Sequence, residues 1–457
     1  MMDKLRLVHY LRISSVALVF IWLFVHFAGG GDDHNRYTAL FRQFRDERAV
    51  FVDDFLSHDV SGRFESDGIM SLCSGKRWTS GLVLTCDAVP GNMADVKNGV
   101  LTCIRIAIEM GAELILPNIM LRSTMDLGTV TPHDVGPRRG VPLEQFFDRP
   151  HLVNTLSDSC PQLKVHPSMD DFYNEPSMLT PFSLDLYKVP GVKVSANLKG
   201  SEGKVIDGKL GDLGKQIHGL LDNKAPRRDR KYPFHVDLRP TPSYALPAFA
   251  DSPKVRNYFG RIMQVRPDLR ALAGSVLFNL QKALGVTIDP RKGIDIDAFI
   301  AVELRTQHDP RKFPPYEVQA SDALAFASAS NMSHIYLTEG TLPEHVTTFA
   351  DRARDFNFTV VTKEELVDGP DAFLLSQLSY DERFLVDYEV ALRSGLFMGN
   401  GQSSFAWNVG LRREFAYGDK GAHDASHLNG AVRWFNQYST LYGKDNVGDE
   451  LRRGIWP

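Results

Sequence analysis

Two stretches of this chain read as a strand, a tight turn and a helix, and they constrain its fold more than any other feature. In the first, the apolar run 81–86 ends in a turn at 87–92, and apolar side chains then recur at helical spacing through 93–110. Gly111 follows this helix, and residues 113–117 read as the next strand. A strand, a helix and a strand within about 36 residues form a βαβ unit, which requires a parallel sheet.

The second stretch lies closer to the C-terminus. Residues 385–392 have apolar side chains at helical spacing, residues 396–398 read as a buried strand, and a glycine turn leads through Ser403 and Ser404 into another helix. Further strands, each preceded by a helical segment, are expected at 298–305, 335–337 and 358–361. This pattern predicts a second doubly wound α/β domain.

The length of 457 residues exceeds that of one ordinary core, so we expect two domains. Prolines at 240, 242 and 247 mark the crossing between them, and one long helix is expected over 252–284. The predicted parts are a cytosolic tail and signal-anchor helix (1–31), a stem and leading helix (32–80), an N-terminal Rossmann-like domain (81–245), a C-terminal Rossmann-like domain (246–430) and a tail (431–457) that packs on the first domain.

The N-terminal segment differs from the rest of the chain. Residues 13–28 are almost wholly apolar, and Lys4, Arg6 and Arg12 precede them. A helix of this length spans roughly 24 Å, which suits a thin early-secretory bilayer, and the preceding positive charges favour a cytosolic N-terminus. We therefore predict a type II, single-pass anchor in the Golgi or endoplasmic reticulum membrane, with the remaining chain in the lumen. A signal peptide cleaved near residues 28–30, which would give a secreted protein, and a buried core helix are the alternatives.

Two further features agree with a lumenal location. Asn331-Met332-Ser333 and Asn357-Phe358-Thr359 are N-glycosylation sequons. The cysteines are even in number and all follow the apolar segment, so in an oxidising compartment they allow two disulfides with three possible pairings. Free buried cysteines are the alternative, and no Cys/His spacing suggests zinc. The four cysteines are Cys73, Cys86, Cys103 and Cys160.

Three polar stretches fall at the carboxyl ends of predicted strands, where open parallel sheets bind their ligands. They are residues 91–95, 303–309 and 401–405. Arg305 leaves a buried strand, which is costly unless its guanidinium meets an anion, and the planar group suits a diphosphate. Two serines at a helix start add donors to the positive end of the helix. The structural alternatives are an N-cap, a tight turn, and an ion pair of Arg305 with Asp309 or Asp387.

Several other classes of ligand are disfavoured. The net charge of −4 gives no reason to expect nucleic acid. The chain has no GxxxxGK[ST] sequence and no good GxGxxG sequence, which argues against a P-loop protein and a Rossmann dehydrogenase. No Asp-x-Asp sequence precedes an evident metal site, so we expect no metal ligands and no permanently bound cofactor. Arginine and helix-end amides would then neutralise a diphosphate.

Five segments of the chain resemble the GDP-fucose protein O-fucosyltransferase family, and motifs that follow one another in the family's order make the resemblance fairly specific. Residues 91–95 (Gly-Asn-Met-Ala-Asp), with the helix and strand that follow, resemble the family's Gly-Asn-Gln-Ala-Asp opening. Residues 303–309 (Glu-Leu-Arg-Thr-Gln-His-Asp) are similar to His-Leu-Arg-Phe-Glu-x-Asp, and residues 146–152 and 361–366 to segments of the plant O-fucosyltransferase-like branch. The family's C-terminal Asp…Phe-x-Gly…Ser-Thr-Phe pattern is similar to Asp387, Phe397, Gly399, Ser403, Ser404 and Phe405. The likeness covers roughly residues 81–412.

The resemblance implies an α/β, GT-B-like fold in which two Rossmann-like domains face a cleft, with the acceptor on the N-terminal side and the nucleotide sugar on the C-terminal side. It implies an inverting transfer of fucose from GDP-fucose to a hydroxyl of a secretory-pathway protein or glycan, without a required metal. Arg305 would hold the diphosphate and stabilise its departure, and Asn92 would lie near the sugar or the acceptor. The nucleotide would contact Gly91, Asp309, Asp387, Ser403, Ser404 and Phe405.

Two positions depart from the family pattern. Glu303 stands where the family has histidine, and Gln307 where it has an acidic residue. Because these positions bear on guanine or ribose recognition, the alternatives are another nucleotide-sugar donor, a glycan acceptor such as a cell-wall polysaccharide, and a non-catalytic member that binds glycans or partner proteins. Displacement at the anomeric carbon also needs a group that accepts the acceptor's proton. Asp95, Glu303 and the leaving diphosphate are the candidates.

Overall fold

A computed structural model describes residues 47–125, 140–195, 205–224, 232–307, 313–417, 423–424, 432–443 and 449–457. The chain forms two compact units, Met1–Asp54 and Phe55–Pro457. In the first unit, residues 47–54 are helical. The predicted membrane anchor lies outside the described residues, and none of the helices that the structure describes is long and apolar enough to cross a bilayer.

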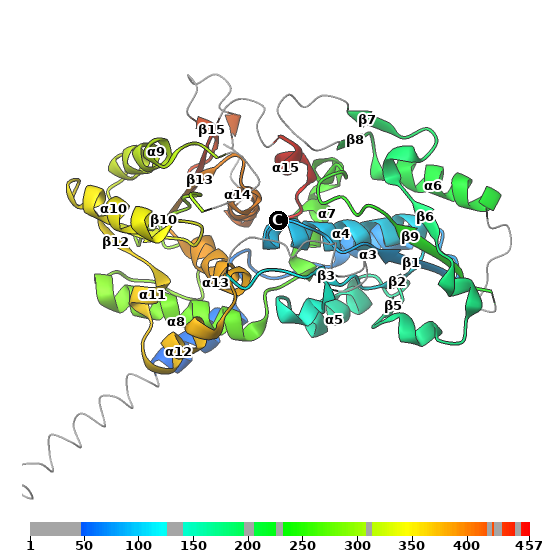
Figure 1. Ribbon diagram of the computed structural model, residues 1–457, viewed down its shortest axis with the longest axis horizontal. Helices are drawn as coiled ribbons and strands as arrows, with labels where there is room; N and C mark the ends of the chain where they lie inside the picture. Colours follow the sequence, from blue (N-terminus) through cyan, green and yellow to red (C-terminus); the bar gives the residue numbers. More distant parts are fainter. Residues whose placement is uncertain are drawn as a thin grey trace, which may run out of the picture. The chain divides into compact units, whose positions relative to one another are not determined.

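The larger unit contains two sheets built from parallel strands, as predicted (Figure 1). The first sheet has the strand order β5-β2-β1-β9-β6, and all of its strands are parallel. The β1–α4–β2 segment supplies its predicted βαβ unit. Its strands are β1 (Leu82–Cys86), β2 (Glu113–Ile115), β5 (Val165–His166), β6 (Phe182–Leu184) and β9 (Phe234–Leu238).

The second sheet has the order β12-β11-β10-β13-β16-β15-β14. Its described pairings are parallel from β12 to β16, and the last two, β16–β15 and β15–β14, are antiparallel. Two short antiparallel pairs, β3–β4 and β7–β8, lie outside both sheets. The strands of the second sheet are β10 (Ile300–Val302), β11 (His334–Leu337), β12 (Thr359–Val361), β13 (Leu396–Asn400), β14 (His423–Asp424), β15 (Val432–Phe435) and β16 (Ser439–Tyr442). The short pairs are β3 (Ile119–Met120), β4 (Gly140–Val141), β7 (Lys193–Ser195) and β8 (Val205–Asp207).

Helices connect and cover these strands. The α-helices are α3 (Asp67–Ser74), α4 (Met93–Met110), α5 (Arg149–Ser159), α6 (Leu210–Lys224), α7 (Pro253–Tyr258), α8 (Pro267–Leu284), α9 (Tyr316–Ser328), α10 (Pro343–Arg354), α11 (Lys363–Leu366), α12 (Gly369–Gln377), α13 (Tyr380–Arg393), α14 (Ser404–Tyr417) and α15 (Asp449–Gly454). The 3-10 helices are η1 (Leu143–Gln145), η2 (Met169–Phe172), η3 (Pro176–Leu179), η4 (Leu186–Lys188), η5 (Ala248–Ala250) and η6 (Phe259–Ile262).

Helix α4 has the bounds that the sequence predicts, and both of its ends are capped. The Asn92 side chain accepts hydrogen bonds from the N–H groups of Ala94 and Asp95, and Asp95 accepts one from the N–H of Asn92 in return. At the other end, Gly111 has φ = 57°, and a Cβ there would lie 1.9 Å from the Arg77 carbonyl oxygen. Glycine is therefore required at this turn.

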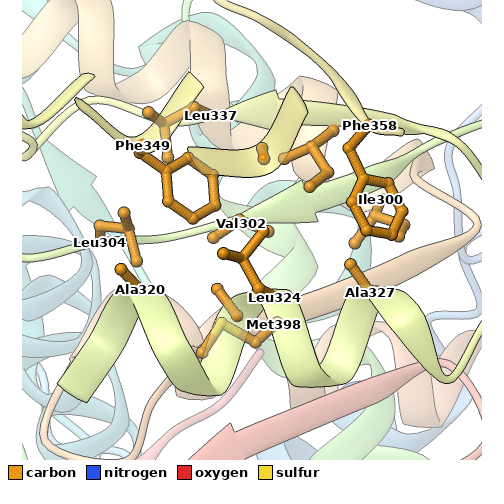
Figure 2. Packing of buried hydrophobic residues seen from close by; sticks show 13 residues of the cluster. Ile300, Val302, Leu304, Ala320, Leu324, Ala327, Leu337, Phe349, Phe358 and Met398 are labelled. Atoms are coloured by element: carbon orange, nitrogen blue, oxygen red, sulfur yellow. The ribbon is translucent and has the colours of Figure 1, made fainter. Parts of the chain in front are cut away.

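Strand β10 and the residues after it divide their side chains between two faces. Ile300, Val302 and Leu304 alternate along the chain and lie in one buried apolar cluster, as the two-residue period of a strand requires. Each such buried side chain contributes about 1.5–3 kcal/mol. The side chains of Glu303 and Arg305 lie on the opposite face, where Glu303 contacts Ser403, just before α14, and Arg305 contacts Phe384 of α13. Figure 2 shows the rest of the cluster, including Ala320, Leu324 and Ala327 of α9 and Phe349 of α10.

The structure differs from the prediction in the segment 252–284 and in the C-terminal tail. The single helix predicted over 252–284 is wrong: it is divided into α7, η6 and α8. Pro267 begins α8, and a proline at this first position has no N–H with which to continue a preceding helix. In the predicted tail, β15 and β16 extend the second sheet beside β13. The last residues do contact the first region, because the Trp456 N–H donates to Asn98 of α4.

All four cysteines are paired, so the alternative of free cysteines is wrong. Cys73 bonds to Cys160 across 87 residues, and Cys86 at the end of β1 bonds to Cys103 on α4 across 17 residues. The longer bridge joins α3 to the residue that ends α5, and the shorter one joins the first strand to its own helix. The two bridges thus constrain the unfolded chain to different extents.

We expect the two disulfides to differ in their contribution to stability. In the loop-entropy account, removing Cys73–Cys160 lowers the free energy of unfolding by about 4.6 kcal/mol, whereas removing Cys86–Cys103 lowers it by about 3.1 kcal/mol. Urea unfolding of the Cys73→Ala/Cys160→Ala and Cys86→Ala/Cys103→Ala variants measures both. An equal or reversed order would show that native-state contacts, and not loop length, set the contribution.

Candidate functional site

The N-termini of two helices meet between the two sheet regions. The Asn92 Nδ2 group donates to the Ser404 hydroxyl at 2.9 Å, and Asn92 Oδ1 lies 3.1 Å from the same hydroxyl. Asn92 caps α4, while Ser404 is the first residue of α14. Because each helix N-terminus carries a partial positive charge, the meeting of two of them favours a nearby anion.

A buried carboxylate lies at the start of α14. Glu303 follows β10 and is 1% exposed, and its Oε1 accepts a hydrogen bond of 2.6 Å from the Ser403 hydroxyl. The same hydroxyl oxygen accepts a hydrogen bond from the N–H of Ala406. Glu303 therefore fixes the residue that precedes the helix, and its negative charge is stabilised by the helix dipole.

Arg305 is held at both its backbone and its side chain. Its N–H donates to the Gln319 side chain at 2.8 Å, and its carbonyl accepts from the same amide at 3.0 Å. The guanidinium lies 5.6 Å from the ring centroids of both Phe313 and Phe384, and its Nη1 donates to the Tyr380 hydroxyl. Two aromatic rings and a clamped backbone give this cation a fixed position at the carboxyl end of β10.

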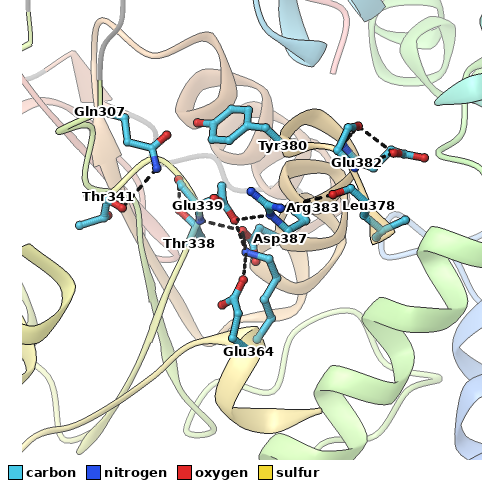
Figure 3. Close-up of polar contacts among 12 residues, drawn as sticks. Gln307, Thr338, Glu339, Thr341, Glu364, Leu378, Tyr380, Glu382, Arg383 and Asp387 are labelled. Atoms are coloured by element: carbon cyan, nitrogen blue, oxygen red, sulfur yellow. Dashed lines mark hydrogen bonds and ion pairs between the residues drawn. The ribbon is translucent and has the colours of Figure 1, made fainter. Parts of the chain in front are cut away.

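The loop beside Arg305 is fixed by Asp387, which is fully buried on α13 (Figure 3). Its carboxylate accepts hydrogen bonds from the Tyr336 hydroxyl, from the Glu339 N–H at 2.7 Å and from the Lys363 ammonium at 2.9 Å. Lys363 also lies 2.7 Å from the Glu339 carboxylate. Asp387 is thus placed to hold this loop, while its own oxygens are taken up by protein groups.

The loop in turn positions Arg305. The Gly340 carbonyl accepts hydrogen bonds from the N–H groups of Thr306 and Gln307, and a Cβ on Gly340 would lie 3.0 Å from Arg305 Nη1. At φ = 108°, Gly340 also has a backbone conformation that favours glycine. Asp387 acts on Arg305 through this loop, and Gln307, half-buried, donates to the Thr341 carbonyl beside it.

The charges of this network are maintained at neutral pH. Burial raises the pKa of the Asp387 carboxyl to about 6, while Lys363 opposes a further rise. Although burial opposes a charge on Lys363, Asp387 and Glu339 raise the pKa of its ammonium. The ion pair is therefore charged at pH 7, with its partners removed from water.

The remaining predicted site residues lie around these groups. Gly91 has φ = 103°, and a Cβ there would lie 2.3 Å from Asp95 Oδ2, so glycine is needed for the capping turn. Asp95 is 3% exposed, and besides its capping bond it accepts one from the Tyr244 hydroxyl. The Phe405 ring lies 4.5 Å from that of Phe384. Asp309 lies outside the described residues.

A second polar group lies at the carboxyl ends of β1, β2 and β9, around a pocket of about 170 Å³. The Thr85 hydroxyl donates to Asp237 at 2.9 Å and contacts His235 at 2.8 Å. The Arg239 guanidinium forms ion pairs with two carboxylates, with Asp237 at 2.7 Å and with Asp87 at 3.1 Å. This group was not predicted, although the alternation of His235 and Asp237 along β9 with Arg239 directly after it is a signal in the sequence.

Sequence reasoning also missed the residues that hold Arg305. They are Gln319, Glu339, Gly340, Lys363 and Tyr380, which come from separate segments of the chain. Within the described residues, no group of three or more His, Cys, Asp or Glu side chains is arranged to hold a metal ion.

No protein-family model matches this chain, and no curated protein matches it in sequence. Among solved structures, POFUT1 in complex with GDP-fucose is similar at 14% identity and a TM-score of 0.42, over 74% of this chain and 96% of that one. The apo form of POFUT1 gives 13% identity and a TM-score of 0.40, over 74% and 95%. NodZ alpha-1,6-fucosyltransferase soaked with GDP-fucose is similar at 13% identity and a TM-score of 0.35, over 74% of this chain and 93% of that one. The fold and site themselves define an α/β protein with two sheets of mainly parallel strands and a buried arginine that contacts Tyr380, the first residue of α13.

We expect Lys363→Met to lower the free energy of unfolding by about 3–5 kcal/mol, because it leaves the buried Asp387 and Glu339 carboxylates without their shared cation. Lys215→Met, at a side chain that is 83% exposed, is the matched control and should change stability by less than about 0.5 kcal/mol. Urea unfolding measures both variants. Equal stability of the two variants would contradict the role of this network.

Proposed function

We propose that this protein is a glycosyltransferase with a GT-B-like arrangement that transfers fucose from GDP-fucose to a hydroxyl of a protein or glycan. The observation that carries this proposal is the position of Arg305, which is fixed between Phe313 and Phe384 at the carboxyl end of β10. Such a cation, next to a helix N-terminus, is suited to a diphosphate leaving group. The motif likeness at residues 91–95, 303–309 and 403–405 supports fucose as the sugar.

In the proposed reaction, an acceptor hydroxyl oxygen attacks the anomeric carbon of the sugar. The bond between that carbon and the β-phosphate oxygen breaks, and its electron pair leaves with GDP. Arg305 and the N–H groups at the start of α14 stabilise the charge that develops on this oxygen. Attack opposite the departing oxygen inverts the configuration at the anomeric carbon. Asn92, which binds Ser404, is proposed to lie next to the sugar.

The acceptor's proton goes to an oxygen of the departing diphosphate in this proposal. Neither candidate carboxylate is exposed: Asp95 is engaged by Tyr244 and the N–H of Asn92, and Glu303 by Ser403. We propose positioning roles for both, since each fixes one of the two helix N-termini. Gly91, Ser403, Ser404 and Phe405 would shape the nucleotide site, and Asp387 would act through the Gly340 loop. For Asp309, a contact with the nucleotide is proposed only because of its place in the 303–309 motif.

Nucleotide binding tests this proposal through Arg305. We expect GDP to raise the unfolding temperature of the protein, because a ligand that binds only the folded state stabilises it by about 2.7 kcal/mol at a hundredfold excess over its dissociation constant. Arg305→Ala removes charge-assisted hydrogen bonds and should weaken GDP binding by about 1.5–3 kcal/mol. Arg352→Ala, an arginine of α10 that pairs with Glu317, is the control and should bind GDP normally.

The outcomes separate the alternatives. Stabilisation by GDP and GDP-fucose, but not by UDP-sugars, supports the proposed donor, whereas stabilisation by UDP-sugars alone replaces it. An undiminished response in Arg305→Ala contradicts the role of this residue. Absence of stabilisation by any nucleotide favours a non-catalytic protein that binds glycans or partner proteins.

We further propose that residues after the N-terminal segment lie in the lumen of the secretory pathway, with a type II membrane anchor. Asn331 and Asn357 are exposed and precede β11 and β12. The two sequons are adjacent, because the Thr359 N–H donates to the Ser333 carbonyl at 2.9 Å. They lie at the amino ends of parallel strands, whereas Arg305 follows the carboxyl end of β10, so glycans there would leave the site open.

We expect both sequons to carry a glycan when the chain is expressed in eukaryotic cells. Asn331→Gln and Thr359→Ala should each remove one, seen as faster gel migration, and glycosidase treatment should bring all forms to one mobility. Thr359→Ala is preferable to a change at Asn357, which has φ = 62°. A wild-type protein whose mobility is unchanged by the glycosidase would contradict the lumenal assignment.

A further inference from the structure

A cavity of about 480 Å³ lies between η5, α7, the second half of α14 and α15. Helix α15 contacts both η5 and α14 (Figure 1). None of the described residues that line the cavity belongs to the environment of Arg305, and the cavity begins roughly 10 Å along α14 from Ser404, at about 1.5 Å per residue. Small-molecule sites typically have volumes of about 300–1,000 Å³. The cavity therefore has room for a ligand of more than one ring, and not only for a single ion.

The side chains around this cavity are predominantly cationic. Three arginines line it, against the single carboxylate of Glu414. The arginines are Arg256 in the last turn of α7 and Arg452 and Arg453 in the last turn of α15. No uncharged polar side chain is among the lining residues that the structure describes. Recognition in this cavity would therefore depend on charge, and not on a pattern of neutral hydrogen-bonding side chains.

Two of these arginines are held by aromatic rings and have no anionic partner. The guanidinium carbon of Arg256 lies 5.0 Å from the centroid of the Phe415 ring, and that of Arg453 lies 5.9 Å from the centroid of the Phe249 ring. Neither guanidinium forms an ion pair or a hydrogen bond with a residue that the structure describes, and Arg256 Nε is a buried donor without an acceptor. An aromatic ring positions a cation but supplies no acceptor in the guanidinium plane. An anionic ligand would supply the missing acceptors.

Helix α15 is fixed directly after its two arginines. The Gly454 carbonyl accepts a hydrogen bond from the Asn98 side chain at 2.7 Å, and the Trp456 indole N–H donates to Asp251 at 3.0 Å. Both Asn98 and Trp456 are fully buried. Because this backbone is already held by the core, little further ordering of α15 is needed when a ligand binds.

We propose that this cavity binds an acidic oligosaccharide, with carboxylate or sulfate groups on Arg256 and Arg453. Both kinds of group have oxygens that accept the paired N–H groups of a guanidinium. More than one acidic group is expected on the ligand, because the arginines come from two helices and outnumber the one carboxylate. Phe249, which is 49% exposed, offers an apolar face for a sugar ring. The choice of a carbohydrate among polyanions rests on the proposed glycosyltransferase function, whereas the anion site itself does not.

The test measures the binding of two acidic oligosaccharides to the full chain by isothermal titration calorimetry. An oligogalacturonate carries carboxylates and a heparin-derived hexasaccharide carries sulfates as well, so the pair shows which acid is preferred. The neutral control is the fully methyl-esterified oligogalacturonate, which has the same sugar rings without the charges. We expect at least one acidic oligosaccharide to bind about tenfold more tightly than this control at low salt. Its affinity should fall as salt is added, because the Debye length is only about 10 Å at 0.1 M ionic strength.

Arginine variants locate the binding to this cavity. Arg256→Gln and Arg453→Gln should each weaken binding of the acidic oligosaccharide by about tenfold, since each removes charge-assisted hydrogen bonds, and the double variant should bind it no better than the neutral control. Arg354→Gln, at a side chain that is 75% exposed and pairs with Asp351, is the matched control and should bind as wild type does. Thermal unfolding without ligand verifies that each variant is folded.

Three results would overturn the proposal. The first is equal affinity of wild type for the acidic and the methyl-esterified oligosaccharides. The second is undiminished binding by a folded Arg256→Gln/Arg453→Gln variant, which would leave these arginines only the stabilisation of two helix ends. The third is equally tight binding of inorganic polyphosphate of the same charge, which would show that the sugar contributes nothing.

Stabilisation by GDP, measured on the same double variant, keeps this proposal distinct from the proposed function. Because neither Arg256 nor Arg453 lies in the environment of Arg305, the response to GDP should equal that of wild type. Absence of a GDP response in wild type would contradict the proposed function and leave the oligosaccharide result to be judged on its own. Loss of the GDP response in the double variant alone would make this cavity part of the nucleotide site and overturn the assignment.

Discussion

The complete burial of α4 is the constraint on which the larger unit depends. All 18 of its residues are buried, including polar and charged ones, so each polar group must find its partner within the protein. Asn92 binds Ser404 of α14, Asn98 binds the carbonyl of Gly454 and the N–H of Trp456, and Arg105 binds Asp251. One helix thereby joins the first sheet, the start of α14 and the C-terminal residues. Breaking any of these bonds would leave a buried polar group unsatisfied at about 1–3 kcal/mol.

The position of the site follows from the two-residue period of β10 and the residues after it. Ile300, Val302 and Leu304 enter the apolar cluster beside α9, which obliges Glu303 and Arg305 to take the opposite face. A shift of one residue would exchange the two sets and place both charges in the core. The apolar cluster therefore determines where the two charged side chains lie, and the Gln319 amide of α9 then fixes the Arg305 backbone.

Local patterns in the sequence were sufficient for the parts of the fold that depend on nearby residues. The bounds of α4, its end at Gly111 and the parallel strands on either side follow from periodicity and turn residues, whereas the Asn92 capping box was not predicted. Pro267 is itself a local signal that a new helix begins, but the interruption of the predicted helix was missed because apolar residues continue at helical spacing across it. The partners of Asp387 were not predictable, since Tyr336, Glu339 and Lys363 lie 51, 48 and 24 residues away and come together only in the fold. The same is true of β16, whose pairing with β13 depends on a distant segment.

The junction of the two helix N-termini is held by protein groups alone and would also suit the proposed anion. The Asn92 amide and the Ser404 hydroxyl satisfy each other, so the junction needs no anion to remain folded. A phosphate oxygen that replaced one of these contacts would exchange one hydrogen bond for another, and such an exchange is close to neutral in free energy. The net gain in binding would then come from charge, supplied by Arg305 and the helix dipoles. Because Arg305 is already held by Phe313, Phe384 and the Gly340 loop, little conformational entropy is lost when an anion binds.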